Sequence, residues 1–143
     1  MDEALAEARR AEALGEVPVG AVVVIDGRVA GRGHNLRETS GDPTAHAEIL
    51  AIREAARQVG NWRLERAVLY VTLEPCPMCA GALVLGRFDT VVFATEDPKA
   101  GACGSLFNIV QDDRLNHRVR VIRGVRKDEA QRLLRSFFQR LRH

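Results

Sequence analysis

Two short motifs must meet in space, and this requirement constrains the fold of the chain more than any other feature of its sequence. One motif is His46-Ala47-Glu48, and the other is Pro75-Cys76-Pro77-Met78-Cys79. Zinc prefers imidazole and thiolate ligands, and a catalytic zinc site keeps three protein ligands and leaves the fourth position for water. His46, Cys76 and Cys79 supply such a set. Glu48 is not needed as a ligand, so it remains available as the general acid and base beside that water.

The residues around these motifs predict helices that alternate with strands. A strand is expected at 17–25, and it turns at Asp26-Gly27 into a partner strand at 28–33. The polar stretch 35–43 is expected to be a loop, and Ser105 is expected to cap a short helix after the glycine-rich loop 96–105. The other expected helices are 2–14, 44–59, 76–85 and a C-terminal helix with an apolar stripe over 130–141, and the other expected strands are 67–73, 91–94 and 119–122.

This order of elements predicts an α/β fold, namely a three-layer α/β/α sandwich around a five-stranded mixed sheet. A helix of about 16 residues runs roughly 24 Å, and a strand of about eight residues returns roughly 26 Å. The chain therefore comes back to the level of His46 when it reaches Cys76. We expect His46 and Glu48 to lie in the first turn of one helix and the two cysteines in the first turn of another, where unpaired N–H groups favour thiolates.

Length and composition limit the class of protein. The 143 residues, 46% hydrophobic and 28% charged, predict one globular domain over 1–143. No apolar run approaches the roughly 18 residues of a membrane span, and the acidic start Met1-Asp2-Glu3 does not resemble a signal peptide. We therefore expect a cytoplasmic protein. Three cysteines in such a protein indicate metal or redox chemistry rather than disulfides.

The charge of the chain is unevenly distributed. Residues 1–113 carry 11 Lys and Arg against 17 Asp and Glu, whereas residues 114–143 carry 10 against 2, which gives net charges of −6 and +8. A basic tail on an acidic body is typical of nucleic-acid contact. The alternative is a solvated helix face with no partner.

The C-x-x-C motif alone has other interpretations. It occurs in thioredoxin-like redox pairs and in structural zinc knuckles. A redox pair does not require an upstream H-x-E motif. A knuckle requires a fourth ligand, which His34, His117 or Cys103 would have to supply without the usual close spacing.

The combination of H-x-E with P-C-x-x-C is the known signature of zinc-dependent nucleobase deaminases. Over nearly its whole length the chain resembles the bacterial tRNA-specific adenosine deaminases of the cytidine deaminase-like superfamily. The resemblance rests on residues 16–22, Asn35, residues 42–48 and residues 70–82. It is specific to the tRNA-editing branch at residues 97–102, at Gly104-Ser105, at residues 116–119 and at Phe137-Phe138.

The resemblance implies a substrate, a cofactor and an assembly. The substrate would be the wobble adenosine in a tRNA anticodon stem-loop, converted to inosine by attack of a zinc-activated water at C6 with release of ammonia. The enzyme would act as a homodimer with one Zn²⁺ per chain and no nucleotide cofactor. By the same resemblance, Asn35, Ala47, Asp97 and Phe138 would contact the substrate, although Asn35 and Asp97 are also typical turn residues.

Several expectations qualify this resemblance. An acidic Asp97 would repel phosphates, so a ribose 2′-hydroxyl is its expected partner. Periodicity alone places both Phe137 and Phe138 in the core. Cys103 stands where the family is expected to have a small residue such as alanine, and we expect it to be a buried thiol.

Two other functions remain open at this point. One is a free-base deaminase of the same superfamily, acting on guanine or cytosine. Such an enzyme would gain nothing from a basic tail. The other is an RNA-binding module that zinc stabilises and that has no catalytic activity.

Overall fold

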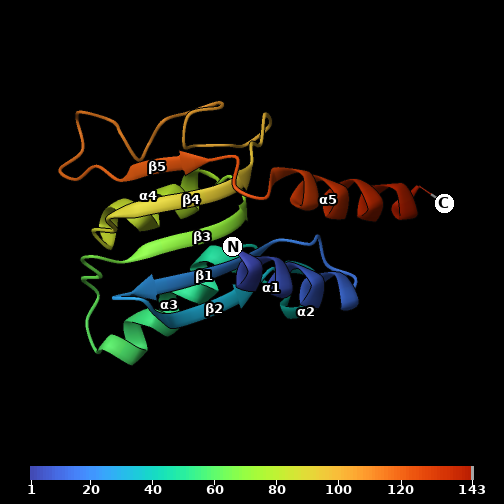
Figure 1. Cartoon of the computed structure of the whole chain (residues 1–143), viewed down its shortest axis with the longest axis horizontal. Coiled ribbons are helices and arrows are strands. Elements are labelled where there is room, and N and C mark those ends of the chain that lie inside the picture. Colours follow the sequence, from blue (N-terminus) through green and yellow to red (C-terminus); the bar gives the residue numbers. More distant parts are fainter. Residues whose placement is uncertain (143) are drawn as a thin grey trace.

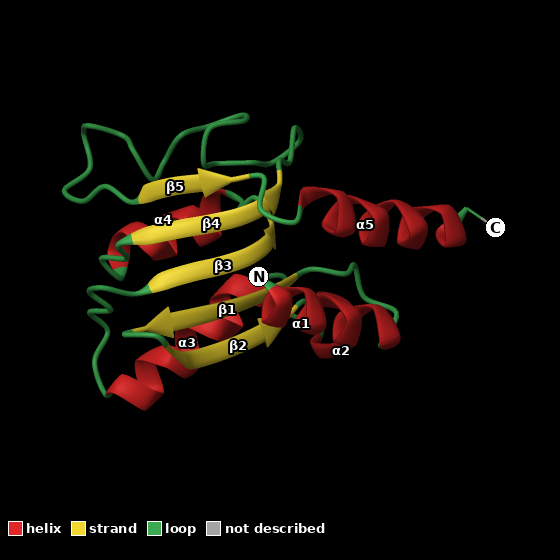
Figure 2. Ribbon diagram, viewed as in Figure 1, coloured by secondary structure: helices red, strands yellow, loops and turns green. Residues whose placement is uncertain are grey.

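The computed structural model describes residues 1–142 as a five-stranded sheet with helices on both faces (Figures 1 and 2). The strands are β1 (Gly20–Ile25), β2 (Arg28–His34), β3 (Val68–Leu73), β4 (Thr90–Thr95) and β5 (Arg120–Arg123). The helices are α1 (Asp2–Ala13), α2 (Arg37–Ser40), α3 (Ala47–Val59), α4 (Pro77–Leu85) and α5 (Lys127–Leu141). None of the helices within 1–142 combines the length and apolar character required to span a bilayer.

The sheet has the order β2-β1-β3-β4-β5 and is mixed. β1 pairs antiparallel with both β2 and β3, whereas β3 pairs parallel with β4, and β4 with β5. Parallel strands end at the same edge of a sheet, and here Leu73 at the end of β3 lies opposite Thr95 at the end of β4. The segments that follow these two strands therefore begin side by side.

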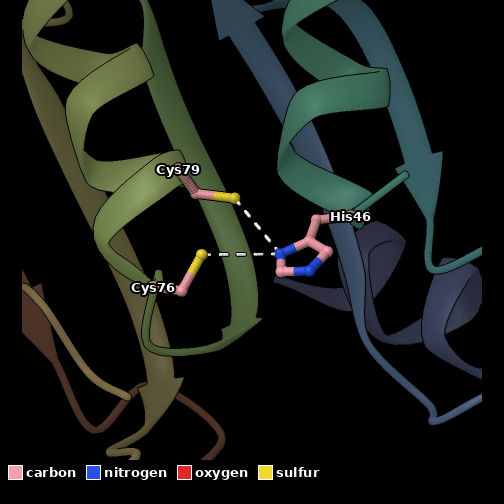
Figure 3. A group of neighbouring side chains, drawn as sticks. All are labelled: His46, Cys76 and Cys79. Carbon is pink, nitrogen blue, oxygen red and sulfur yellow. Dashed lines mark hydrogen bonds between the residues drawn. The ribbon is translucent and has the colours of Figure 1, made fainter. Parts of the chain in front are cut away.

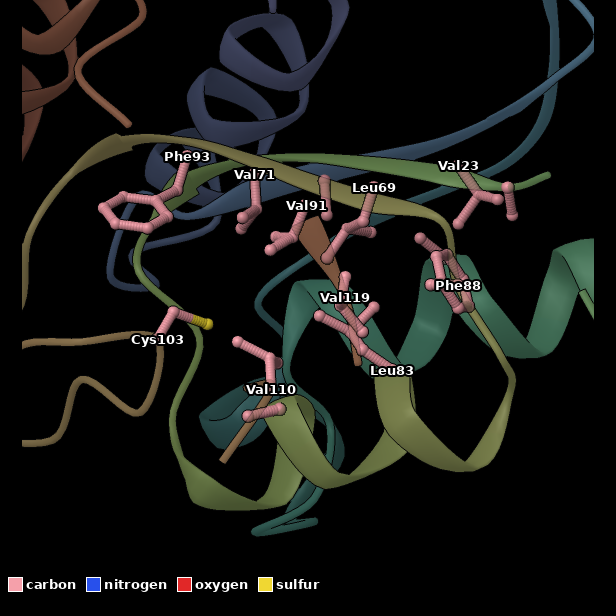
Figure 4. Close-up of a cluster of buried hydrophobic side chains, with 14 of the residues drawn as sticks. Val23, Leu69, Val71, Leu83, Phe88, Val91, Phe93, Cys103, Val110 and Val119 are labelled. Atoms are coloured by element: carbon pink, nitrogen blue, oxygen red, sulfur yellow. The ribbon is translucent and has the colours of Figure 1, made fainter. Parts of the chain in front are cut away.

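The core has two parts, one on each face of the sheet. The larger cluster packs α3 and α4 against one face, with Leu83, Val91 and Phe93 among its fully buried members (Figure 4). The smaller cluster joins Leu5 of α1, Ala94 of β4 and Ala130 of α5 on the other face. These two clusters confirm the predicted three-layer α/β/α sandwich.

Helix α3 lies unusually close to β2 because that strand contains glycines. A Cβ atom at Gly33 would lie 2.3 Å from the carbonyl oxygen of Ala47, and one at Gly31 would lie 2.1 Å from that of Ala51. Real Cβ atoms do not approach backbone so closely. The glycines therefore permit the contact that fixes the first turn of α3 against the sheet.

Replacing Gly33 with alanine should lower the free energy of unfolding by about 1–3 kcal/mol, because the added methyl group must displace the backbone of α3. Urea denaturation followed by circular dichroism measures this loss. Gly81→Ala in α4 is the matched control, since a Cβ there meets nothing within 4 Å. The control should be neutral or stabilising by up to about 1 kcal/mol. Equal stability of Gly33→Ala and the wild type would refute this account of the close approach.

Three local predictions were wrong. The helix that carries the first motif begins at Ala47 rather than Thr44, because the Asp42 carboxylate accepts hydrogen bonds from the backbone N–H and hydroxyl of Thr44 and holds it in a turn. The stretch 35–43 contains the short helix α2. Ser105 does not cap a helix, because its N–H and hydroxyl donate to Glu74 instead.

Candidate metal centre and pocket

Two helix N-termini bring the predicted metal ligands together. His46 is the residue before α3 and Cys76 is the residue before α4, and both have extended backbone conformations. Cys79 lies one turn further along α4, on the face that looks toward α3 (Figure 3). The two helix starts therefore bring the three candidate ligands together, although His46 and Cys76 directly precede their helices instead of lying in the first turns as expected.

The geometry of this group fits a tetrahedral metal ion. The Nδ1 atom of His46 lies 3.5 Å from the Sγ atom of Cys76 and 3.6 Å from that of Cys79 (Figure 3). Zn–S bonds of about 2.3 Å and Zn–N bonds of about 2.0–2.1 Å at tetrahedral angles require separations of about 3.6 Å. One imidazole and two thiolates are also a donor set that zinc prefers. The group can therefore hold a metal ion.

No fourth ligand joins this group within the described part of the chain. The three residues are the only His, Cys, Asp or Glu side chains of residues 1–142 that cluster in this way. His34 bonds to Glu7, His117 contacts the carbonyl oxygen of Phe88, and Cys103 lies in the apolar core beside Val110 (Figure 4). None of the candidates for a structural knuckle is in place, and a three-ligand centre is typical of catalytic zinc.

Hydrogen bonding and burial together shift the pKa values of this site. A hydrogen bond from Cys79, opposed by burial and assisted by His46, lowers the pKa of the Cys76 thiol to about 4, while the same sulfur pair and burial raise the pKa of Cys79. Burial raises the pKa of the Glu48 carboxyl to about 7. Glu48 is only 4% exposed and lies one residue into α3, outside the ligand group. It is thus placed beside the metal position without being required as a ligand.

A pocket of about 210 Å³ opens onto His46, Glu48 and Cys76. Its size suits a small planar group rather than a drug-sized ligand. Three of the four residues predicted to contact substrate line this pocket, namely Asn35, Ala47 and Asp97. The complete lining is Val17, Val19, Asn35, Arg37, His46, Ala47, Glu48, Leu73, Glu74, Cys76, Asp97 and Ala100.

Asn35 and Asp97 both bind the neighbouring backbone and line the pocket. The Asn35 side chain accepts the N–H of Arg37 through Oδ1 and donates to the carbonyl of Val17. Asp97 accepts the N–H groups of Lys99 and Ala100 through one carboxylate oxygen. These bonds fix the backbone while the residues still line the pocket.

Phe138 lies outside the pocket, in a second concave surface on α5. That surface is lined by Lys99, Arg135, Phe138, Gln139 and Arg142. Phe138 is 43% exposed, whereas Phe137 is buried and meets it edge to face at 5.4 Å. The prediction from periodicity that both rings are in the core was therefore wrong for Phe138.

The sequence did not single out the carboxylates that shape the two sides of the pocket. The Glu16 carboxylate accepts the N–H groups of Glu38 and Thr39 at the start of α2, and the Glu74 carboxylate accepts donors from the loop after β4. Burial raises the pKa of Glu74, but the hydrogen bonds from Ser105, Asp97 and Cys103 outweigh it, so the pKa lies below its ordinary value. The available signal for Glu74 was its position directly before Pro75-Cys76.

Comparison with known proteins places the chain in a class and then in a family. A family model described as MafB19-like deaminase matches residues 1–142, and with the fold and the three-ligand centre it defines the class as a deaminase. A tRNA-specific adenosine deaminase of Bacillus subtilis (strain 168) is 55% identical over 142 residues, which cover 99% of this chain and 88% of that protein. The chain therefore belongs to the family of tRNA-specific adenosine deaminases.

Solved structures support the same assignment. A structure from work on A-to-I editing by tRNA:A34 deaminases superimposes with a TM-score of 0.90 at 43% identity, covering 94% of this chain and 97% of that chain. A guanine deaminase from Bacillus subtilis superimposes with a TM-score of 0.65 at 40% identity, covering 73% of this chain and 67% of that chain. The match to the tRNA deaminase is the more complete of the two.

Proposed function

We propose that this protein converts adenosine at the wobble position of a tRNA anticodon to inosine. The observation that carries the proposal is the three-ligand group that adjoins a pocket beside Glu48, in a chain that is 55% identical to a tRNA-specific adenosine deaminase. Water is added at C6 of the adenine, the bond between C6 and the exocyclic nitrogen breaks, and ammonia leaves. Residues 1–143 act as one domain, in the cytoplasm, where tRNA is available.

The metal that we propose is one Zn²⁺ per chain, held by His46, Cys76 and Cys79. When bound, zinc supplies Lewis-acid activation of the attacking water. Glu48 takes a proton from that water and delivers it to the departing amino group, which is the work of a general acid and base. Its buried position keeps the carboxyl away from bulk water.

The pocket residues orient the base. Asn35 presents a buried side chain with hydrogen-bonding groups to the pocket, and Ala47 forms part of the wall beside the metal position. Asp97 keeps one carboxylate oxygen outside its own turn, and we propose that this oxygen accepts the ribose 2′-hydroxyl of the flanking RNA. The apolar lining excludes water around a base that has left its stack.

The surface on α5 is proposed to hold the rest of the stem-loop. Figure 1 shows that α5 projects beyond the sheet, and Phe138 with Arg135 and Arg142 lines a concave surface on that helix. An exposed aromatic ring suits base stacking, and the guanidinium groups suit phosphates. This arrangement favours an RNA substrate over a free base.

The decisive experiment is incubation of the zinc-loaded protein with an anticodon stem-loop that carries adenosine at the wobble position. Inosine should be detected by nuclease digestion and mass spectrometry. A stem-loop with guanosine at that position is the control and should remain unchanged. Absence of inosine together with turnover of free guanine or cytosine would assign the chain to the free-base deaminases.

Binding of the stem-loop should weaken steeply with salt, because phosphate contacts release counterions. Replacing Arg135 with alanine should weaken binding and reduce the slope of log K against log salt by about 1. Arg28→Ala is the matched control, because Arg28 is exposed at the end of β2 that lies away from the pocket. Fluorescence anisotropy at several salt concentrations measures the affinity and the slope for each variant. An unchanged slope for Arg135→Ala would exclude Arg135 as a phosphate contact.

We propose in addition that the protein acts as a homodimer. The support for this assembly is the resemblance to the tRNA-specific adenosine deaminases. Sedimentation equilibrium at micromolar concentration should give twice the chain mass, and a monomer there would refute this assembly.

A further inference from the structure

The carboxylate of Glu74 binds one loop through four hydrogen bonds. Its two oxygens accept the backbone N–H groups of Asp97 at 3.0 Å, Cys103 at 3.0 Å and Ser105 at 3.1 Å, and also the hydroxyl of Ser105. Glu74 is 2% exposed and is not part of the metal-binding group. Because all four hydrogen-bond donors to this buried carboxylate lie in residues 97–105, the carboxylate holds that loop in place.

The loop is packed against this carboxylate without spare room. A Cβ atom at Gly101 would lie 2.4 Å from the carboxyl carbon of Glu74 and 2.5 Å from the carbonyl oxygen of Asp97. The backbone N–H of Gly101 donates to that same carbonyl at 2.8 Å. Loop residues 97–105 therefore wrap around the Glu74 side chain.

The same loop forms one wall of the pocket. Asp97 and Ala100 line the pocket together with the candidate metal ligands His46 and Cys76. We call the set of hydrogen bonds from loop 97–105 to the Glu74 carboxylate the clamp. Its base is fixed at the edge of the sheet, where the backbone N–H of Glu74 donates to the carbonyl of Thr95 at 2.9 Å. The loop also contacts the second motif, since the N–H of Ala102 donates to the carbonyl of Pro75 at 2.8 Å.

We propose that Glu74 is a positioning residue that holds loop 97–105 as a preformed wall of the substrate pocket. Asp97 and Ala100 then occupy their places before the substrate arrives, so that binding does not have to order the loop. Glu74 itself donates no proton and binds no metal in this scheme. The inference rests on the proposed function, because it assigns the wall to the nucleotide that enters this pocket.

The test compares Glu74→Gln with the wild type. Glutamine keeps the size of the side chain but replaces one accepting oxygen by an NH2 group that faces N–H donors. Hydrogen–deuterium exchange in residues 97–105 should accelerate about tenfold or more. The KM for the anticodon stem-loop should rise about tenfold while kcat changes less than about threefold, because the loss falls on binding. Metal content should remain that of the wild type.

Glu7→Gln is the matched control. Glu7 is another buried acid, 3% exposed, but its partners are His34 and Arg10, and it does not line the pocket. This variant should lose stability without a change in KM or in the exchange of residues 97–105. A rise in KM equal to that of Glu74→Gln would mean that general destabilisation explains both, and would overturn the proposal.

Ser105→Ala tests the same clamp more gently, since it removes one of the four donors and keeps the backbone N–H. It should give a smaller increase in loop exchange and in KM. The inference would be refuted if both Ser105→Ala and Glu74→Gln showed the loop exchange and the KM of the wild type. If Glu74→Gln does not fold, Ser105→Ala alone decides.

If the wild-type protein forms no inosine, the proposed function fails. Hydrogen–deuterium exchange of loop 97–105 then still tests whether Glu74 holds the loop.

Discussion

Replacing Glu48 with alanine should reduce inosine formation by about 10²–10⁴-fold, the usual contribution of a positioned general acid and base. The metal should stay bound, because Glu48 lies outside the group formed by His46, Cys76 and Cys79. Single-turnover assays on the stem-loop measure the rate, and atomic absorption measures the metal content of the same sample.

This variant separates catalysis from binding. A protein that only binds RNA would have no activity to lose, and Glu48→Ala would bind the stem-loop as the wild type does. Full activity in Glu48→Ala would exclude the proposed proton transfer. Glu54→Ala is the matched control, since Glu54 lies later on α3 and its carboxylate accepts the N–H of Arg32 outside the pocket. This control should keep wild-type activity.

Replacing Cys79 with alanine should abolish tight metal binding and lower the rate of deamination by at least about 10³-fold, because Lewis-acid activation contributes several kcal/mol to the transition state. Cys79 is fully buried and within 3.6 Å of the His46 imidazole, so no other described side chain can take its place. Metal analysis and the inosine assay on one preparation measure both effects.

Cys103→Ala is the control for this prediction, since Cys103 is a buried thiol in the apolar core and not in the ligand group. It should retain metal and activity. Extraction of the metal with a chelator should reproduce the Cys79→Ala result in the wild type, and added Zn²⁺ should restore activity there but not in the variant. Activity that survives metal removal would refute the proposed chemistry.

The clustering of His46, Cys76 and Cys79 and the layers of the fold could be predicted because they depend on residue type and spacing. Zinc accepts few kinds of ligand, and the strand and helix lengths between His46 and Cys76 return the chain to one level. The start of α3 could not be placed, because the turn at Thr44 depends on whether the Asp42 side chain binds the backbone there.

The pocket walls were harder to predict than its base. The role of Glu74 depends on a loop whose donors lie 23 to 31 residues further along the chain, and no periodicity reports such a contact. Phe138 shares the apolar stripe of α5, yet it is 43% exposed while the adjacent Phe137 is buried. Neighbouring residues lie about 100° apart around a helix, so the two rings point in different directions, and only the tertiary packing decides which of them is covered.

The division of the metal ligands between two units has a consequence for how the protein is made. His46 belongs to the β2-α3 unit, and both cysteines follow β3, so a growing chain cannot assemble the ligand set until α4 has been synthesised. Before that point the imidazole alone binds zinc weakly. Capture of the proposed ion would therefore be coupled to the pairing of β3 with β1, the step that brings the two ligand-bearing segments together.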